Sequence, residues 1–173
     1  MKKRLLLDMD GVIADVYAQY IRLEYNHSGV LYTPDMFNGK LEAEIIPNCI
    51  KHVTSEGFFR TAPVMEGSIE GVRLLNDRYQ LYIVSSATEY PKSLPEKQAW
   101  LNEYFPFISW RQMVFCGDKS VVSGDIMVDD HPKNLDYFIG RRILFTQPHN
   151  IFHDKPDCER VDHWAQLKEL LLL

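Results

Sequence analysis

The sequence has few cysteines and no surplus of positive charge. Its three cysteines, Cys49, Cys116 and Cys158, are odd in number and far apart, so they signal neither a disulfide framework nor a zinc motif. This usage suits a reducing cytosol. Lysine and arginine total 19 against 24 aspartates and glutamates, a net charge of −5. A general nucleic-acid-binding protein would normally carry a basic face, so we expect no nucleic-acid polymer as a partner.

Long apolar runs are also missing. The charged start of the chain is followed by three leucines, but Asp8 and Asp10 interrupt this stretch. It is too short and too polar for a signal peptide or a membrane span. The sequence contains no internal repeat and no low-complexity segment. We therefore expect one soluble, cytoplasmic domain without a membrane partner, with room for an inserted subdomain.

Short apolar runs alternate with helical patterns along the chain. None of the runs alternates cleanly with polar residues, which is typical of strands buried on both faces of a parallel sheet. Strands that alternate with helices predict a doubly wound α/β fold. The expected strands are residues 5–7, 81–84, 126–128 and 143–145, with 111–115 as a fifth candidate. The expected helices are residues 68–78, 95–105 and 162–173.

Three of these expected strands end in acidic or small polar residues. Asp8 follows the first run, Ser85 and Ser86 follow the second, and Asp129 and Asp130 follow 126–128. In open parallel sheets, ligands bind beyond the carboxyl ends of the strands. At any single strand these residues are explained as ordinary turn formers. The three strand ends together favour a binding site.

The pair Asp8 and Asp10 favours a hard divalent cation. Residues two apart in a strand point to the same face, so the two carboxylates lie near one another. Such a pair is costly unless a cation or a proton relieves the repulsion. A shell made only of oxygen atoms indicates Mg²⁺. A calcium loop of the EF-hand type is excluded, because Val12 and Ile13 stand where that loop needs a ligand and a glycine.

Two lysines are candidates for holding an anionic substrate. Lys97 lies in "SLPEK", where Ser93 and Glu96 predict a capping box with Pro95 in the first helical turn. A lysine in a first turn opposes the helix macrodipole. Lys119 in "CGDKSVV" is the second candidate. For both lysines, a solvated surface position is the alternative.

Histidines offer weaker signals. His149 and His153 are four residues apart, but Pro148 and Asn150 favour a loop over a helical zinc site. His131 directly follows the acidic pair, where it either approaches a phosphate or simply occupies a turn.

Four motifs resemble those of the haloacid dehalogenase (HAD) superfamily. They are "LLLDMDGVIAD", "LYIVSSAT", "PEKQAW" and "DIMVDDHP". In finer detail, "EKQAWLNEYF", "DKSVVSGDIMVDD" and "RRILFTQPHN" are similar to the 5′(3′)-deoxyribonucleotidases. The resemblance implies a Rossmann-like parallel sheet between helices, with a small helical cap inserted after the first strand. It also implies a Mg²⁺-dependent enzyme that dephosphorylates nucleoside monophosphates.

The resemblance assigns the chemistry to two aspartates and a metal. Asp8 would be the nucleophile that forms an aspartyl-phosphate, and Asp10 would be the general acid and base. Asp8, the carbonyl of Asp10 and the carboxylate of Asp130 would bind Mg²⁺. Asp129 would orient Lys97 or a metal-bound water.

The resemblance also assigns substrate contacts. Ser85 and Lys97 would hold the phosphoryl oxygens and stabilise the charge that develops on them, with Ser86 beside them. Lys119 would add a phosphate or nucleotide contact. Tyr17 stands next to the position where the family places an aromatic residue.

The long connection after the first motif predicts the cap. We expect the core to comprise residues 1–14 and 68–173 and the cap residues 15–67, with helices over 12–25 and 41–55, the latter interrupted by Pro47. A cap that closes over the substrate would exclude water and select the leaving group. Its aromatic residues would stack on a nucleobase or pack the cap against the core.

Three functions follow as hypotheses. The first is a 5′(3′)-deoxyribonucleotidase acting on a deoxynucleoside monophosphate, and the relatives suggest a homodimer. The second is the same phosphatase chemistry on another small phosphomonoester, such as a sugar phosphate. The third is a non-catalytic phosphoryl-binding protein. The repelling acidic cluster argues against the third, because a scaffold has no need of it.

Overall fold

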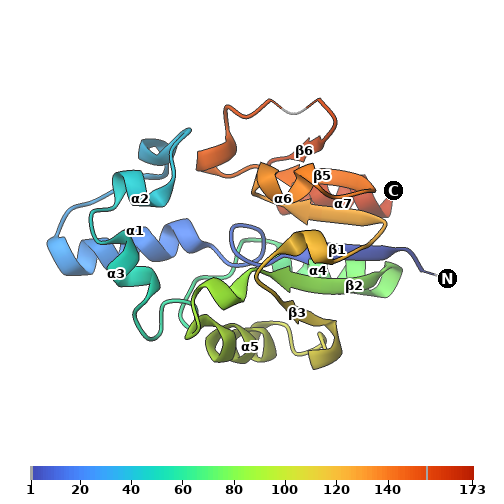
Figure 1. Cartoon of the computed structure of the whole chain (residues 1–173), viewed down its shortest axis with the longest axis horizontal. Coiled ribbons are helices and arrows are strands. Elements are labelled where there is room, and N and C mark those ends of the chain that lie inside the picture. Colours follow the sequence, from blue (N-terminus) through green and yellow to red (C-terminus); the bar gives the residue numbers. More distant parts are fainter. Residues whose placement is uncertain (1, 155) are drawn as a thin grey trace.

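Six parallel strands form one sheet in the computed structural model, which describes residues 2–154 and 156–173 (Figure 1). The strand order is β3-β2-β1-β4-β5-β6, so β1 lies between β2 and β4. The strands are β1 (Arg4–Asp8), β2 (Gln80–Ser85), β3 (Met113–Phe115), β4 (Ile126–Asp129), β5 (Arg141–Phe145) and β6 (Glu159–Val161).

The five strands expected from the sequence are all present, with ends that shift by at most two residues. The sixth strand, β6, was not predicted. It is three residues long at the edge of the sheet, and only Val161 is buried. A single buried residue leaves no apolar run for sequence reasoning to detect.

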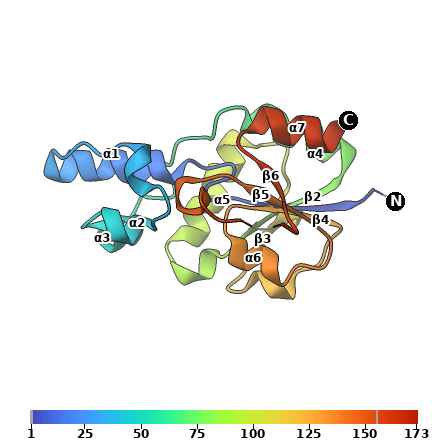
Figure 2. The same ribbon diagram turned by 90° about the horizontal axis from the view of Figure 1, so that it is seen from above.

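Helices cover both faces of the sheet (Figure 2). Leu5 and Leu7 point into one apolar cluster, whereas Leu6 points into the other, as the alternation of a strand requires. The first cluster is covered by α4 (Ser68–Arg78), α5 (Ser93–Tyr104) and α7 (Trp164–Leu172), and the second by α6 (Pro132–Asp136). The predicted Rossmann-like α/β fold is confirmed. Within the described ranges, no helix has the length and apolar character needed to cross a membrane.

The predicted capping box of α5 is wrong. The helix begins at Ser93, whose hydroxyl donates to the carbonyl of Ala87 at 2.7 Å. Glu96 does not turn back to its own helix. Its two carboxylate oxygens accept backbone N–H bonds from Gly57, Phe59 and Arg60 at 2.6–3.1 Å. A long-range partner with three donors outcompetes a local cap.

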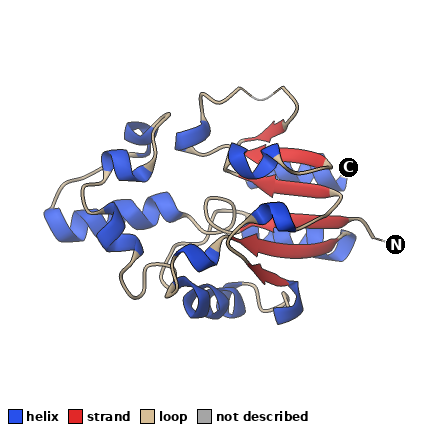
Figure 3. Ribbon diagram, viewed as in Figure 1, coloured by secondary structure: helices blue, strands red, loops and turns tan. Residues whose placement is uncertain are grey.

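Three α-helices lie between β1 and α4, at the carboxyl end of the sheet (Figures 1 and 3). We call residues 16–53 the helical segment. It contains α1 (Val16–Ser28), α2 (Glu42–Ile45) and α3 (Cys49–Val53), and the break between α2 and α3 falls at Pro47 as expected. The expected helix over 12–25 begins only at Val16, because the amides of residues 12–14 all donate to the carbonyl of Met9 in a tight turn.

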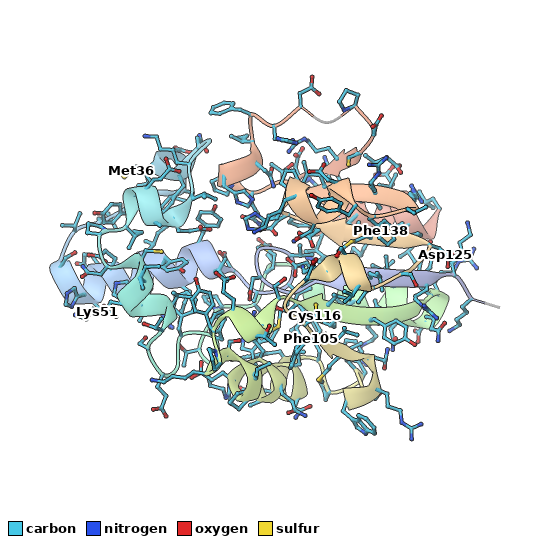
Figure 4. The ribbon with its side chains drawn as sticks, viewed as in Figure 1. Met36, Lys51, Phe105, Cys116, Asp125 and Phe138 are labelled. Carbon is cyan, nitrogen blue, oxygen red and sulfur yellow. The ribbon has the colours of Figure 1, made fainter. Side chains whose placement is uncertain are left out.

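The helical segment and the residues that follow it contact the rest of the chain on two sides. At one side, residues 57–60, just after the helical segment, are bound to Glu96 of α5. At the other, the amide of Gly39 donates to the carbonyl of Pro148 at 2.9 Å, and the ring of Phe152 lies against Gly39. In Figure 4, Met36 and Lys51 mark the helical segment, far from Asp125 at the opposite end of the molecule. The predicted division into a core and a cap over residues 15–67 stays a prediction.

Candidate active site

The three strands at the centre of the sheet deliver polar side chains to one edge. Asp8 ends β1, Ser85 ends β2 and Asp129 ends β4. Each is at most 5% exposed. The chain leaves β1 toward β2 on one side and later returns to β4 on the other, and a crevice forms where the strand order reverses in this way. The strand ends that the sequence predicts to form a site therefore lie side by side in the sheet.

Lys119 connects two of the acidic residues. It lies in the 3-10 turn η4 (Lys119–Val121), just before β4. Its Nζ donates to Oδ1 of Asp8 at 2.5 Å and to Oδ2 of Asp129 at 2.7 Å. The expectation that Asp129 orients Lys97 is wrong, because Lys119 takes that position from a turn that directly precedes the strand of Asp129. Burial of Lys119 also excludes the alternative of a solvated surface lysine.

Lys97 holds the other side of the site. Its Nζ donates to Oγ of Ser85 at 2.8 Å and contacts Oδ2 of Asp10. The ammonium also lies 4.5 Å from the centre of the Phe59 ring, a cation–π contact. Lys97 is buried, so the surface alternative is excluded for this lysine too.

The acidic pair after β4 has two different environments. Asp129 accepts from Lys119 with one oxygen, and with the other from the amide of His131 and the side chain of Asn134, both at 2.9 Å. Asp130 has a buried Oδ1 without a hydrogen-bond partner among the described residues. A β-carbon added to Gly11 would stand only 2.1 Å from Oδ2 of Asp130. A buried oxygen without a donor requires a cation or a proton.

These acidic residues fit a hard divalent cation. One carboxylate oxygen from each of Asp8, Asp129 and Asp130 lies within 4.8 Å of the others. An all-oxygen donor set matches Mg²⁺. Because Asp129 is already fully bonded, Asp8 and Asp130 are the carboxylates with oxygens to spare. The structure leaves the predicted ligation by the Asp10 carbonyl untested.

Burial sets the protonation of the cluster. It raises the pKa of the Asp8 carboxyl to about 7, with Lys119 opposing the rise and the charges of Asp129 and Asp10 adding to it. Burial also raises the pKa of Asp130 well above its usual range, with Asp8 and Asp129 adding to the effect. Burial disfavours the charged form of Lys119, but the carboxylates of Asp129 and Asp8 outweigh it and raise the pKa of this ammonium. Without a metal ion, the cluster therefore retains a proton near neutral pH.

A pocket of about 320 Å³ opens over these groups. Seven of the nine residues expected at the site line it: Asp8, Asp10, Ser85, Ser86, Lys97, Lys119 and Asp130. The exceptions are Asp129 and Tyr17, which do not line the pocket. Val16 and Tyr20, four residues apart on one face of α1, line it instead. Tyr17 points elsewhere and its hydroxyl bonds Nδ1 of His149 at 2.9 Å.

The far wall of the pocket comes largely from the helical segment and the residues that follow it. This wall is mostly apolar, with acidic side chains at its rim. The apolar residues are Tyr20, Cys49, Ile50, Val53, Phe58, Phe59 and Tyr90, and the acidic ones are Glu42 and Glu89. A small organic group attached to a phosphate would meet this wall once the phosphate lies between Lys97 and Lys119.

Sequence reasoning missed the residues that support the site from the loop after β5. Gln147 donates to the carbonyl of Gly11 at 2.5 Å, and Asn150 donates to the carbonyl of Asp130 at 2.7 Å. His149 also bonds that carbonyl, at 3.0 Å. The signal was available, because "TQPHN" follows the end of another parallel strand, where ligand-site residues gather.

Comparisons with known proteins give a consistent result. A family model described as "5' nucleotidase, deoxy (Pyrimidine), cytosolic type C protein" matches residues 2–173. The chain is 35% identical over 175 residues to a 5′(3′)-deoxyribonucleotidase of Bacillus subtilis, covering 99% of this chain and 100% of that protein. It is also 35% identical over 171 residues to a Staphylococcus epidermidis protein named as a candidate 5′(3′)-deoxyribonucleotidase, covering 96% and 94% of the two.

Solved structures share the fold. YfnB of Bacillus subtilis, named as a candidate HAD hydrolase and solved bound to magnesium, gives a TM-score of 0.58 at 16% identity and covers 99% of both chains. A HAD-superfamily hydrolase of Geobacter sulfurreducens gives 0.57 at 14% identity, covering 98% of this chain and 96% of that one. At these identities the likeness shows the HAD-type fold alone.

Proposed function

Because the chain belongs to the family of 5′ nucleotidase, deoxy (pyrimidine), cytosolic type C proteins, we propose that it is a Mg²⁺-dependent phosphatase of nucleoside monophosphates, with deoxynucleotides as the preferred class. The observation that carries the proposal is the arrangement around Asp8. One of its oxygens is held by Lys119, and the carboxylate faces a pocket lined by a second lysine, a serine and a second aspartate.

In the first step, Asp8 attacks the phosphorus atom. Its Oδ1 is bonded to Lys119, which fixes the carboxylate and leaves Oδ2 to form the bond to phosphorus. The bond between phosphorus and the nucleoside oxygen breaks, and an aspartyl-phosphate remains. Ser85 and Lys97 lie together at 2.8 Å and supply donors for the phosphoryl oxygens as charge spreads over them.

Asp10 moves the protons. Its carboxyl is a third exposed and lines the pocket, so it can reach an atom of the substrate. It gives a proton to the departing nucleoside oxygen, which is a poor leaving group as an alkoxide. It then takes a proton from the water that hydrolyses the aspartyl-phosphate. Lys97 contacts its Oδ2 and so holds the side chain toward the phosphate.

Magnesium would be held by Asp8 and Asp130. When bound, it would neutralise the acidic cluster and keep Asp8 ionised. The unpartnered oxygen of Asp130 and the space left by Gly11 support this assignment. The protein's own contribution is to fix the carbonyl of Asp130 with Asn150 and to keep Asp129 bonded to Lys119.

The residues 15–67 would act as a cap over the substrate. The rings of Phe58, Phe59 and Tyr90 line the pocket, and a nucleobase stacked on one aromatic ring gains about 1–3 kcal/mol. Closure of this wall would exclude water from the phosphoryl group. We further assign the protein to the cytoplasm and expect a homodimer, which light scattering would check.

The test is a substrate panel with a matched pair of variants. We expect turnover of deoxynucleoside monophosphates with Mg²⁺, slower turnover of ribonucleotides and sugar phosphates, and none of these activities in EDTA. Asp10→Asn should lose about 100-fold or more in kcat, whereas Asp35→Asn, at an exposed position in the helical segment, should not.

Three outcomes would change the assignment. A clear preference for sugar phosphates in kcat/KM would replace the nucleotide substrate. Phosphate binding without turnover of any substrate would favour the non-catalytic alternative. Full activity of Asp10→Asn on natural nucleotides would remove its role as general acid.

A further inference from the structure

Two histidines lie close to Asp130. His131 precedes α6, and His149 lies in η5 (Pro148–Asn150) after β5. Their rings stack with centroids 4.3 Å apart and planes 23° from parallel. One ring nitrogen of each and one carboxylate oxygen of Asp130 all lie within 4.8 Å of one another. Segments far apart in the sequence thus bring two imidazoles and a carboxylate together.

From this geometry we propose a second cation site, formed by Asp130, His131 and His149, that binds a transition-metal ion such as Zn²⁺ or Co²⁺. Imidazole nitrogens suit these ions, whereas Mg²⁺ prefers carboxylate, carbonyl and water oxygens. The unpartnered Oδ1 of buried Asp130 is a second, independent sign that this carboxylate has an open coordination position.

Both ring nitrogens of His149 are hydrogen-bonded, so binding an ion through Nε2 requires the ring to turn away from the carbonyl of Asp130. Nδ1 bonds the hydroxyl of Tyr17 at 2.9 Å, and Nε2 lies 3.0 Å from the carbonyl oxygen of Asp130. When Nε2 binds the ion, its proton moves to Nδ1, which then donates to the Tyr17 oxygen. Metal-bound histidines commonly donate their other N–H in this way.

The carbonyl of Asp130 does not lose its only donor in this change. Asn150 continues to donate to it at 2.7 Å. Tyr17, which does not line the substrate pocket, therefore acquires a role as the residue that orients His149.

Occupancy of the second site would inhibit the enzyme. Asp130 belongs both to this site and to the proposed magnesium site, so both ions would draw on one carboxylate, whose buried Oδ1 has no hydrogen-bond partner among the described residues. The borderline ions bind nitrogen-containing sites more tightly than Mg²⁺. Zn²⁺ is therefore expected to compete with Mg²⁺ and to lower activity, with the inhibition relieved by excess Mg²⁺.

Cobalt spectroscopy tests the site without any substrate. Co²⁺ in a four- or five-coordinate site with imidazole ligands gives intense visible bands, whereas Co²⁺ in an all-oxygen octahedral shell gives weak ones. We expect intense bands in the full-length protein, even with Mg²⁺ in excess, and displacement of Co²⁺ by Zn²⁺. Because this readout needs no turnover, it stands or falls independently of the proposed phosphatase activity.

Variants assign the ligands. His131→Ala and His149→Gln should each weaken Co²⁺ binding by about 10-fold or more and lose more Co²⁺ affinity than Mg²⁺ affinity. The glutamine keeps hydrogen-bonding groups beside Tyr17 and Asp130, so that folding, checked by circular dichroism, is preserved. His153→Ala removes an exposed histidine of the same loop and should leave Co²⁺ binding unchanged. Weak, all-oxygen bands, or equal Co²⁺ affinity in all three variants, would overturn the proposal.

Discussion

At the scale of single residues, Lys119 is held between two buried carboxylates. Its ammonium contacts both the proposed nucleophile Asp8 and the structural acid Asp129. Removing it would leave both negative charges without their cation, and a buried charge that loses its partner is strongly destabilising. The same contact fixes the direction in which Asp8 faces the pocket. One side chain therefore serves both electrostatic balance and nucleophile orientation.

We expect Lys119→Met to lower kcat by about 100-fold or more, the cost of losing one donor to a charged reacting group. Steady-state kinetics on a deoxynucleoside monophosphate would measure it. Lys168→Met is the control, because Lys168 forms a surface ion pair with Glu70 on the α4–α7 side of the sheet and should leave kcat unchanged. Equal kcat in the two variants would contradict the assigned role.

The raised pKa of Asp8 predicts a coupling between pH and metal binding. The carboxyl titrates near pH 7 in the folded, metal-free protein and near 3.9 when unfolded. The folded state therefore binds more protons in this range, so the contribution of Asp8 to stability is full below about pH 4 and is lost as the pH rises through about 7.

Binding of Mg²⁺ requires ionised Asp8, so it should release a proton near pH 6 and tighten as the pH rises toward about 8. Calorimetry in two buffers with different heats of ionisation would count the proton. Thermal unfolding in EDTA should show a Tm that falls less steeply between about pH 4 and 7 in Asp8→Asn than in the unaltered protein. Mg²⁺ binding without proton release near pH 6 would show that the carboxyl is already ionised.

At the scale of elements, the turn after β1 places backbone where a side chain would collide. Gly11 has φ +75°, in the left-handed region that glycine adopts without cost. Its missing β-carbon leaves the space that Oδ2 of Asp130 fills. Its carbonyl is held by Gln147 from the loop after β5. The turn, β4 and the loop after β5 therefore fix one another at the proposed metal site.

Gly11→Ala should raise the Mg²⁺ concentration needed for half-maximal activity by about 10-fold or more, because the new β-carbon displaces Asp130. Gly29→Ala is the matched control. Gly29 has φ +74° but no atom within 4 Å of its would-be β-carbon, so both variants share a backbone cost of about 1–2 kcal/mol. Only the first should change the response to Mg²⁺, and an equal change in both would point to backbone strain as the cause.

Comparison of the predicted and observed elements shows which features of the structure can be predicted from sequence patterns. Apolar runs placed five strands and α4 well, and the polar residues after them located the site, because both signals are local. Which aspartates Lys97 and Lys119 contact depends on whether α5 or the turn η4 lies closer to β4 in the fold. The spacing of residues along the sequence does not encode that distance. Tyr17 was expected at the site because it stands next to the position where the family places an aromatic residue, whereas Val16 and Tyr20 of α1 line the pocket. Glu96 was taken as a local cap, although its donors lie 36–39 residues away.

At the scale of the whole molecule, Glu96 and Lys97 join the pocket wall to the catalytic groups. Glu96 binds the backbone of residues 57–60, and the next residue, Lys97, contacts Ser85, Asp10 and the Phe59 ring. The wall that would meet the nucleoside and the lysine that would meet the phosphate are thus positioned by neighbouring residues of α5.

Glu96→Gln should raise KM more than it lowers kcat, because the amide can satisfy fewer of the three backbone donors and Phe59 then shifts in the pocket. Each donor left unpaired costs about 1–3 kcal/mol. Glu103→Gln is the control on the same helix, since Glu103 forms only an exposed ion pair with Arg60, worth about 0–1 kcal/mol. A fall in kcat alone would show that Glu96 acts through Lys97 and not through the wall.

The contacts on the two sides of the helical segment restrict how the pocket can open. Residues 57–60, just after the segment, bind α5, and Gly39 and Tyr17 of the segment bond the loop after β5. For a segment that moves as the proposed cap, these junctions favour a swing about the line that connects the two sides. Detachment in a single direction would need all of them to break at once. A nucleotide would then enter from one flank, and the phosphate freed at the bottom of the crevice would be the last product to escape.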